Sequence, residues 1–117
     1  MSLIFHLTRV DYYNSFAPDA PYLPRDYEHE GFIHCTQGSG LMLQIANKFY
    51  REVPGEFQAL ILDQDKITAP VKWEPAGSIL FPHIYGPLNR DAVIDIVALK
   101  RAPDGEFIGY ARTIDEA

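Results

Sequence analysis

Hydrophobic residues in this chain fall into short runs that alternate with polar positions or end at proline and glycine. Short apolar runs with period-two alternation, bounded by turn residues, predict β-strands. The Asp104-Gly105 pair is a tight-turn signal, so the final run is expected to pair back as a hairpin strand. We expect strands over residues 3–8, 32–35, 57–63, 71–74, 79–85, 92–99 and 106–110.

Helical periodicity is confined to two segments. The clearer one predicts an amphipathic helix over about 40–51, ended by Pro54-Gly55, and the other a short helix over about 9–16, capped by Thr8. Prolines exclude regular structure between residues 18 and 24. Since the long helices of a doubly wound fold are missing, we predict an α+β fold in a single domain over 1–117. The apolar face of the main helix is expected to contain Leu41, Ile45, Ala46 and Phe49, with Gln44, Asn47 and Lys48 opposite.

Composition and charge narrow the function classes. The net charge is −6, from 16 acidic and 10 scattered basic residues, which argues against a DNA- or RNA-binding surface. No apolar run approaches the roughly 18 residues that a membrane span needs, so we expect no membrane association and a cytoplasmic location. The single cysteine, Cys35, excludes an internal disulfide and a multi-cysteine metal site. Three arginines are candidates for holding a small phosphate: Arg25, Arg51 and Arg90.

Three of the four histidines, His6, His34 and His83, lie inside short apolar runs. His29 lies between two glutamates and is expected to be solvated. Neighbouring strands could bring the three strand histidines to one pocket. Each could equally be a packed histidine with a single hydrogen-bond partner, because burying an imidazole without a partner is costly. Both interpretations stay open.

Further candidates lie close to these histidines in the sequence. His83 and Tyr85 are two residues apart, so on an extended strand they point to the same side. There Tyr85 could donate a hydrogen bond to a ligand or stack on it, or it could simply pack the edge of the sheet. Glu74 ends an apolar strand, where it could act as an acid, a base or a cation stabiliser, or could be an exposed edge residue. Cys35 follows His34 directly and should face the opposite side, as a core residue.

Six short sequence strings in this chain have the order and spacing seen in a known family. The strings are Phe5-His6-Leu7-Thr8, Gly31-Phe32-Ile33-His34-Cys35-Thr36, Ile45-Ala46-Asn47-Lys48-Phe49-Tyr50, Leu60-Ile61-Leu62-Asp63, Trp73-Glu74-Pro75 and Phe81-Pro82-His83-Ile84-Tyr85-Gly86-Pro87-Leu88. From about residue 4 to residue 98 the chain resembles a family of short bacterial and plant proteins catalogued as a domain of unknown function, number 952. That family is thought to be similar in fold to ADP-ribosyltransferases.

The resemblance implies a split β-sheet that holds NAD across a cleft. By strand order, His6, with Thr8 beside it, would contact NAD, His34 would lie on the next strand, and the row of His83 and Tyr85 would take the third position. In ADP-ribosyltransferases that third position often holds a glutamate that stabilises a ribosyl cation. This row has no carboxylate, and Glu74 lies on the preceding segment. The RNA 2'-phosphotransferase branch of the same fold works with histidine and arginines instead.

Three functional hypotheses follow. In the first, the protein binds NAD or an ADP-ribose-type nucleotide through His6, Thr8, His34 and Tyr85 and cleaves the nicotinamide glycosidic bond, with an undetermined acceptor. The catalytic residues would be His34, His83, Tyr85 and Glu74, and no metal would be needed. In the second, the three histidines bind zinc and Glu74 is the base of a hydrolase. In the third, the protein is a noncatalytic nucleotide-binding or regulatory module.

Overall fold

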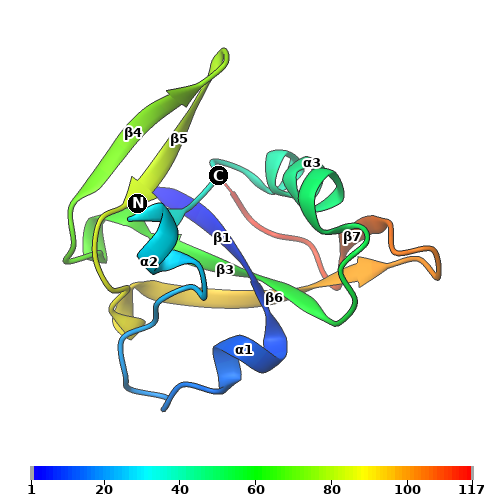
Figure 1. Ribbon diagram of the computed structural model, residues 1–117, viewed down its shortest axis with the longest axis horizontal. Helices are drawn as coiled ribbons and strands as arrows, with labels where there is room; N and C mark the ends of the chain where they lie inside the picture. Colours follow the sequence, from blue (N-terminus) through cyan, green and yellow to red (C-terminus); the bar gives the residue numbers. More distant parts are fainter. Residues whose placement is uncertain (1, 117) are drawn as a thin grey trace.

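The structure is a computed structural model that describes residues 2–116. The larger of its two antiparallel sheets lies at the centre (Figure 1). Its strand order is β1-β3-β6-β7. The strands are β1 (Leu3–Arg9), β3 (Phe57–Asp63), β6 (Val93–Arg101) and β7 (Phe107–Tyr110). All seven residues of β3 are buried, because this strand has a hydrophobic core on each face.

The smaller sheet has the order β2-β5-β4 and includes a hairpin that projects from the body (Figure 1). The strands are β2 (Ile33–His34), β4 (Val71–Ala76) and β5 (Ile79–Ile84). One antiparallel bridge joins the two sheets: Phe5 of β1 and Thr36 exchange backbone hydrogen bonds of 2.8 Å in both directions. The segment after β2 therefore holds the small sheet against the edge of the large one.

Three α-helices accompany the sheets: α1 (Val10–Asn14), α2 (Tyr27–Glu30) and α3 (Ser39–Tyr50). Two 3-10 turns cover Gln64–Lys66 and Arg90–Ala92. The predicted α+β class is confirmed, as are the predicted strands and both predicted helices, with ends that agree or are shifted by one or two residues. α2 was not predicted, because it is a single turn in a segment whose polar residues give no helical period. No helix within residues 2–116 has the length and apolarity needed to cross a membrane.

Three details of the helix predictions were wrong. Phe49 is 59% exposed, while Met42 and Ala46 face the core. Asn47, expected on the solvent face, bonds both backbone groups of Phe107 at 2.9 and 2.7 Å, so this side of α3 faces β7. Thr8 does not cap α1: Arg9 takes that position without a side-chain cap, and the Thr8 hydroxyl lies in the interior.

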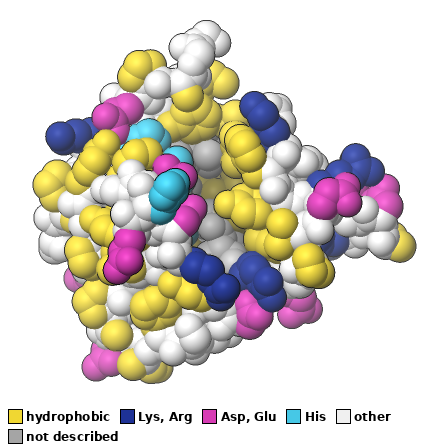
Figure 2. Space-filling model, in the orientation of Figure 1, with side chains coloured by type: hydrophobic (Ala, Val, Ile, Leu, Met, Phe, Trp, Pro, Cys, Tyr) yellow, Lys and Arg dark blue, Asp and Glu magenta, His cyan; other side chains and the backbone are white. Residues whose placement is uncertain are grey.

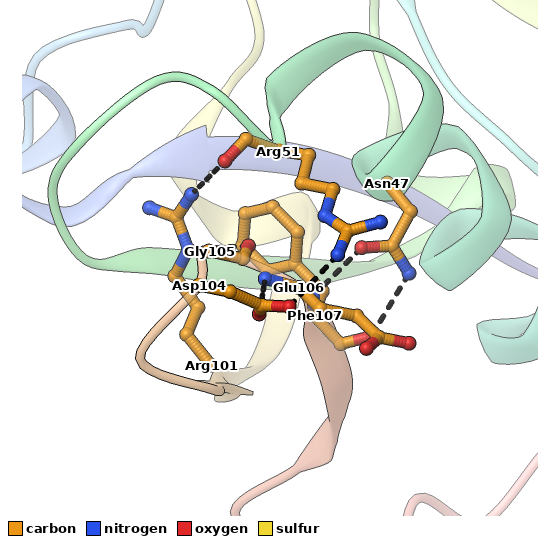
Figure 3. A network of polar contacts seen from close by, with 7 residues as sticks. All are labelled: Asn47, Arg51, Arg101, Asp104, Gly105, Glu106 and Phe107. Carbon is orange, nitrogen blue, oxygen red and sulfur yellow. Dashed lines mark hydrogen bonds and ion pairs between the residues drawn. The ribbon is translucent and has the colours of Figure 1, made fainter.

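Arg101 ties the end of α3 to the β6–β7 turn (Figure 3). Its guanidinium donates to the carbonyl oxygens of Tyr50, Arg51, Gly55 and Gly105 at 2.8 to 3.1 Å. The same group lies 4.3 Å from the ring centroid of Phe107. A helix leaves its last carbonyl groups without internal partners, and Arg101 supplies a donor to those of Tyr50 and Arg51 at the end of α3.

Gly105 is required at this junction by both conformation and space. Its φ is +96°, and a Cβ atom there would lie 2.3 Å from the backbone oxygen of Arg51. Only glycine adopts this backbone region without strain. The turn can therefore lie directly against the end of α3.

Candidate functional site

The outer face of the small sheet carries a cluster of ionisable and aromatic side chains. Successive residues of a strand point to opposite faces, and on this sheet Ile33, Ile84 and Val71 face the hydrophobic core. The intervening positions face outward. Strand pairing places His34 opposite His83, and Lys72 opposite His83 from the other side. A row across three strands results.

Glu74 is the centre of the cluster. Its Oε1 accepts one hydrogen bond from His83 Nδ1 at 2.8 Å and another from the Tyr85 hydroxyl at 2.5 Å. The Tyr85 hydrogen bond, followed by that of His83, lowers the pKa of the Glu74 carboxyl, and the same bond raises the pKa of Tyr85. The Glu74 side chain is 39% exposed. It is therefore an ionised carboxylate within reach of a ligand.

The β4–β5 register brings this carboxylate to the histidine. Glu74 pairs with Phe81 and Lys72 with His83, so Glu74 lies diagonally across from His83 on the same face. Diagonal neighbours on adjacent strands lie roughly 7–8 Å apart, a separation that long side chains can bridge. The carboxylate missing from the row of His83 and Tyr85 is thus supplied by the neighbouring strand.

Phe32 packs over the cluster and fixes the orientation of its rings. Its ring stacks on His83 with centroids 4.0 Å apart and planes at 22°, and lies 4.6 Å from His34 and 5.4 Å from Tyr85. The His83 side chain is consequently only 13% exposed. Phe32 was not recognised in the sequence as part of a site, although its position two residues before His34 places it on the same side of the strand.

His34 is the most accessible member of the cluster. Its side chain is 55% exposed, and Nε2 lies 3.7 Å from Glu30 Oε2 at the end of α2. The His34 and His83 rings are 5.4 Å apart and nearly perpendicular. The structure therefore brings His34, His83, Tyr85 and Glu74 together, the four residues predicted as catalytic.

His6 is not part of this cluster. It lies 5% exposed on the core side of β1, where Nδ1 donates to the His34 carbonyl at 2.6 Å. The Tyr22 hydroxyl lies 3.2 Å from His6 Nε2 and donates to Thr8 Oγ1 at 3.2 Å. Desolvation lowers the pKa of His6 to about 4. His6 meets the cluster at the backbone carbonyl of His34, and Thr8 bonds to Tyr22 in the interior. The predicted contact of both residues with a nucleotide stays a prediction.

The remaining candidates lie elsewhere. Cys35 is buried in the core, as predicted, where desolvation raises its thiol pKa. Arg51 pairs with Asp104 at 2.8 Å, and Arg25 and Arg90 lie over tyrosine rings of α1. His29 is exposed on α2, as predicted.

The geometry does not favour the hypothesis of a three-histidine zinc site. Both ring nitrogens of His6 already face protein groups, and the residue is only 5% exposed. Among residues 2–116 no three His, Cys, Asp or Glu side chains are grouped to hold a metal ion.

One face of the molecule carries a hollow. Figure 2 shows histidine side chains next to acidic ones, beside a hollow at the centre of the view.

These features define an α+β protein with two antiparallel sheets, the smaller of which carries a His-Glu-Tyr cluster on its outer face. Residues 7–96 match the family described as "Protein of unknown function (DUF952)", and the chain belongs to that family. The resemblance seen in the sequence is thereby confirmed at the level of the family. No curated protein matches the chain.

Solved structures of one protein share the fold. The crystal structure of CC0527 from Caulobacter crescentus has a TM-score of 0.78 at 23% identity, over 92% of this chain and 94% of that chain, and a double mutant of CC0527 gives the same values. Its solution NMR structure has a TM-score of 0.70 at 23% identity over 90% of both chains. At this identity the comparison establishes the fold alone.

Proposed function

We propose that the protein binds NAD or a related ADP-ribose nucleotide beside the His-Glu-Tyr cluster and cleaves the N-glycosidic bond to nicotinamide. One observation carries the proposal: Glu74 is an ionised, partly exposed carboxylate held in place by His83 and Tyr85. Cleavage of a glycosidic bond passes through an oxocarbenium-like state with positive charge on the sugar. A carboxylate that is already oriented stabilises such charge without reorganising.

The chemistry divides among the cluster residues as follows. The bond between ribose C1' and the nicotinamide nitrogen breaks, and its electron pair leaves with nicotinamide. Glu74 stabilises the ribosyl cation, and water or another hydroxyl acceptor attacks C1'. His34, with its exposed ring, takes the proton that the acceptor loses.

Aromatic side chains support a nucleotide as the ligand. Phe32, His83 and Tyr85 form a contiguous set of rings beside the carboxylate. A flat ring with partial or full positive charge gains both from stacking on such a surface and from a nearby anion. The oxidised nicotinamide ring has these properties.

Calorimetric titration with NAD, ADP-ribose, nicotinamide and 2'-phosphorylated nucleotides tests binding, and nicotinamide release measured by chromatography tests catalysis. We expect binding of NAD, and a decrease in kcat of about 100-fold or more for Glu74→Gln, as for removal of a stabilising group from an active site. Glu106→Gln, at an exposed glutamate in the β6–β7 turn, is the matched control. Flat heats with all these ligands would refute the proposal, and binding without turnover would leave only its nucleotide-binding part.

A further inference from the structure

The row of His34, His83 and Lys72 is an arrangement that the glycosidic mechanism does not use as a unit. The three residues lie directly opposite one another on β2, β5 and β4. Directly opposed residues on one face have Cβ atoms about 4.5–5.5 Å apart, and the two imidazole rings are 5.4 Å apart. Two proton-transfer groups and a cation therefore lie side by side on one surface.

The two histidines are held differently. His83 Nδ1 is bonded to Glu74, and no hydrogen bond among the described residues occupies its Nε2. A carboxylate on one ring nitrogen fixes the tautomer and leaves the other nitrogen for chemistry. His34 is exposed on the neighbouring strand, with Glu30 3.7 Å from Nε2. Each imidazole thus has its own carboxylate.

Lys72 completes the row. Its side chain is exposed, and Nζ lies 4.9 Å from the centroid of the Tyr85 ring, on the same face as His83. An ammonium group in this position can stabilise negative charge that develops on phosphate oxygens.

From these contacts we propose that the row cleaves the phosphodiester bond of a short ribonucleotide by internal transfer to the ribose 2'-hydroxyl. This activity is separate from the glycosidic cleavage proposed above. The reaction needs one base, one acid and one cation, which are the three groups of the row. The substrate supplies its own nucleophile, because the 2'-hydroxyl lies next to the 3'-phosphate.

The step balances without a further reactant. The 2'-oxygen forms a bond to phosphorus, and its proton passes to one imidazole. The bond from phosphorus to the 5'-oxygen breaks, and that oxygen takes a proton from the other imidazole, which starts as imidazolium. The products are a 2',3'-cyclic phosphate and a free 5'-hydroxyl. The two histidines exchange protonation states, and solvent restores them.

The charge of the protein sets the size of the substrate. Acidic residues outnumber basic ones by 16 to 10, and the basic residues are scattered. Long nucleic acids need many phosphate contacts for affinity, whereas Lys72 provides one beside the row. A dinucleotide is therefore the expected substrate.

The rate should pass through a maximum with pH, because one imidazole must be neutral and the other protonated. The charged and titratable groups that face these two imidazoles come from several elements. Glu30 of α2 and the buried His6 of β1 lie near His34, while Glu74 and Lys72 of β4 face His83, together with Tyr85 after β5.

Adenylyl-(3'→5')-adenosine is the probe, and release of adenosine, followed by chromatography, is the readout. We expect the native protein to release adenosine. In His34→Asn the rate of release should fall by about 100-fold or more, which is the size of a general acid–base contribution. The pH profile of that variant should be one-sided. His34 is exposed, so this variant should fold even if His83→Asn does not. His29→Asn changes an exposed histidine of α2 and is the matched control.

Equal adenosine release by the native protein and by His34→Asn, or no release by either, overturns this inference. All variants are purified identically, so that a contaminating nuclease would appear equally in each. The calorimetric experiment with NAD is independent. Binding of NAD without adenosine release would refute only the proposed phosphodiester cleavage. Adenosine release with flat NAD heats would refute only the proposed NAD function.

Discussion

Replacement of His6 by asparagine should remove most of the acid sensitivity of folding above pH 4. His6 is 5% exposed, and burial lowers its pKa from 6.5 to about 4. The unfolded chain therefore takes up a proton at this residue at a higher pH than the folded protein does. Between the two values the unfolded state binds more protons, so the free energy of unfolding decreases as the pH falls.

The size of the effect follows from the shift. A decrease from 6.5 to about 4, at roughly 1.4 kcal/mol per pKa unit, corresponds to about 3 kcal/mol. This stability is present above the unfolded pKa and is lost as the pH falls toward the folded one, with about 2 kcal/mol gone by about pH 5. Since domains are stable by roughly 5–15 kcal/mol, the loss is a substantial fraction.

Asparagine is suited to the test because its amide N–H can replace the His6 Nδ1 donor to the His34 carbonyl and does not titrate. Its smaller volume and the lost contact with Tyr22 should destabilise the variant by about 1–3 kcal/mol near neutral pH. Urea unfolding, followed by circular dichroism between about pH 7.5 and pH 4.5, should show the native protein and the variant converging as the pH falls.

The exposed His29 provides the control, since His29→Asn should leave the pH dependence unchanged. Parallel stability curves for the native protein and His6→Asn across this range would refute the reasoning. Such curves would mean that burial of the His6 ring does not lower its pKa in the folded protein.

Three further predictions concern the junction at the end of α3 and the cluster. Gly105→Ala should lower the free energy of unfolding by at least about 3 kcal/mol, from backbone strain plus overpacking. Gly77 has φ +65° and open space around it, so Gly77→Ala should cost only about 1 kcal/mol. Urea titration of both variants measures the difference, and equal effects would contradict the prediction. Arg101→Lys should cost about 2 kcal/mol, because an ammonium cannot reach all four carbonyl acceptors, and a change within about 0.5 kcal/mol in the same titration would show that they contribute little. Tyr85→Phe should raise the pKa of Glu74, because the Tyr85 hydroxyl is the main cause that lowers it; carboxyl chemical shifts measured by NMR against pH report this directly, and an unchanged titration midpoint would mean that His83 alone sets it.

Local patterns in the sequence were enough to predict most of the secondary structure. Alternation and turn residues located the strands, because period two and proline or glycine boundaries depend on a few adjacent residues. The rotation of α3 could not be predicted in this way. Asn47 looks like a solvent-facing residue until the backbone of Phe107 is placed beside it.

The candidate site was predictable in part for the same reason. That His83 and Tyr85 share a face follows from their spacing, and that Cys35 faces away from His34 follows from their adjacency. The roles of Lys72 and Glu30 were not recognised, because they meet the cluster through strand pairing and through α2. Phe32 shares a side with His34 by its spacing, but its stack on His83 depends on the pairing of β2 with β5. The difference between His6 and His34 was also hidden, since both lie in similar apolar strings.

The sequence by itself determined the α+β class, the short strands and which neighbouring residues share a strand face, since these depend on local periodicity. Only the tertiary structure decided that Glu74 meets His83 and Tyr85, and that His6 is buried against Tyr22 while His34 is exposed. Pairing register and core packing join residues distant along the chain, and a one-residue change of register would turn Glu74 to the opposite face.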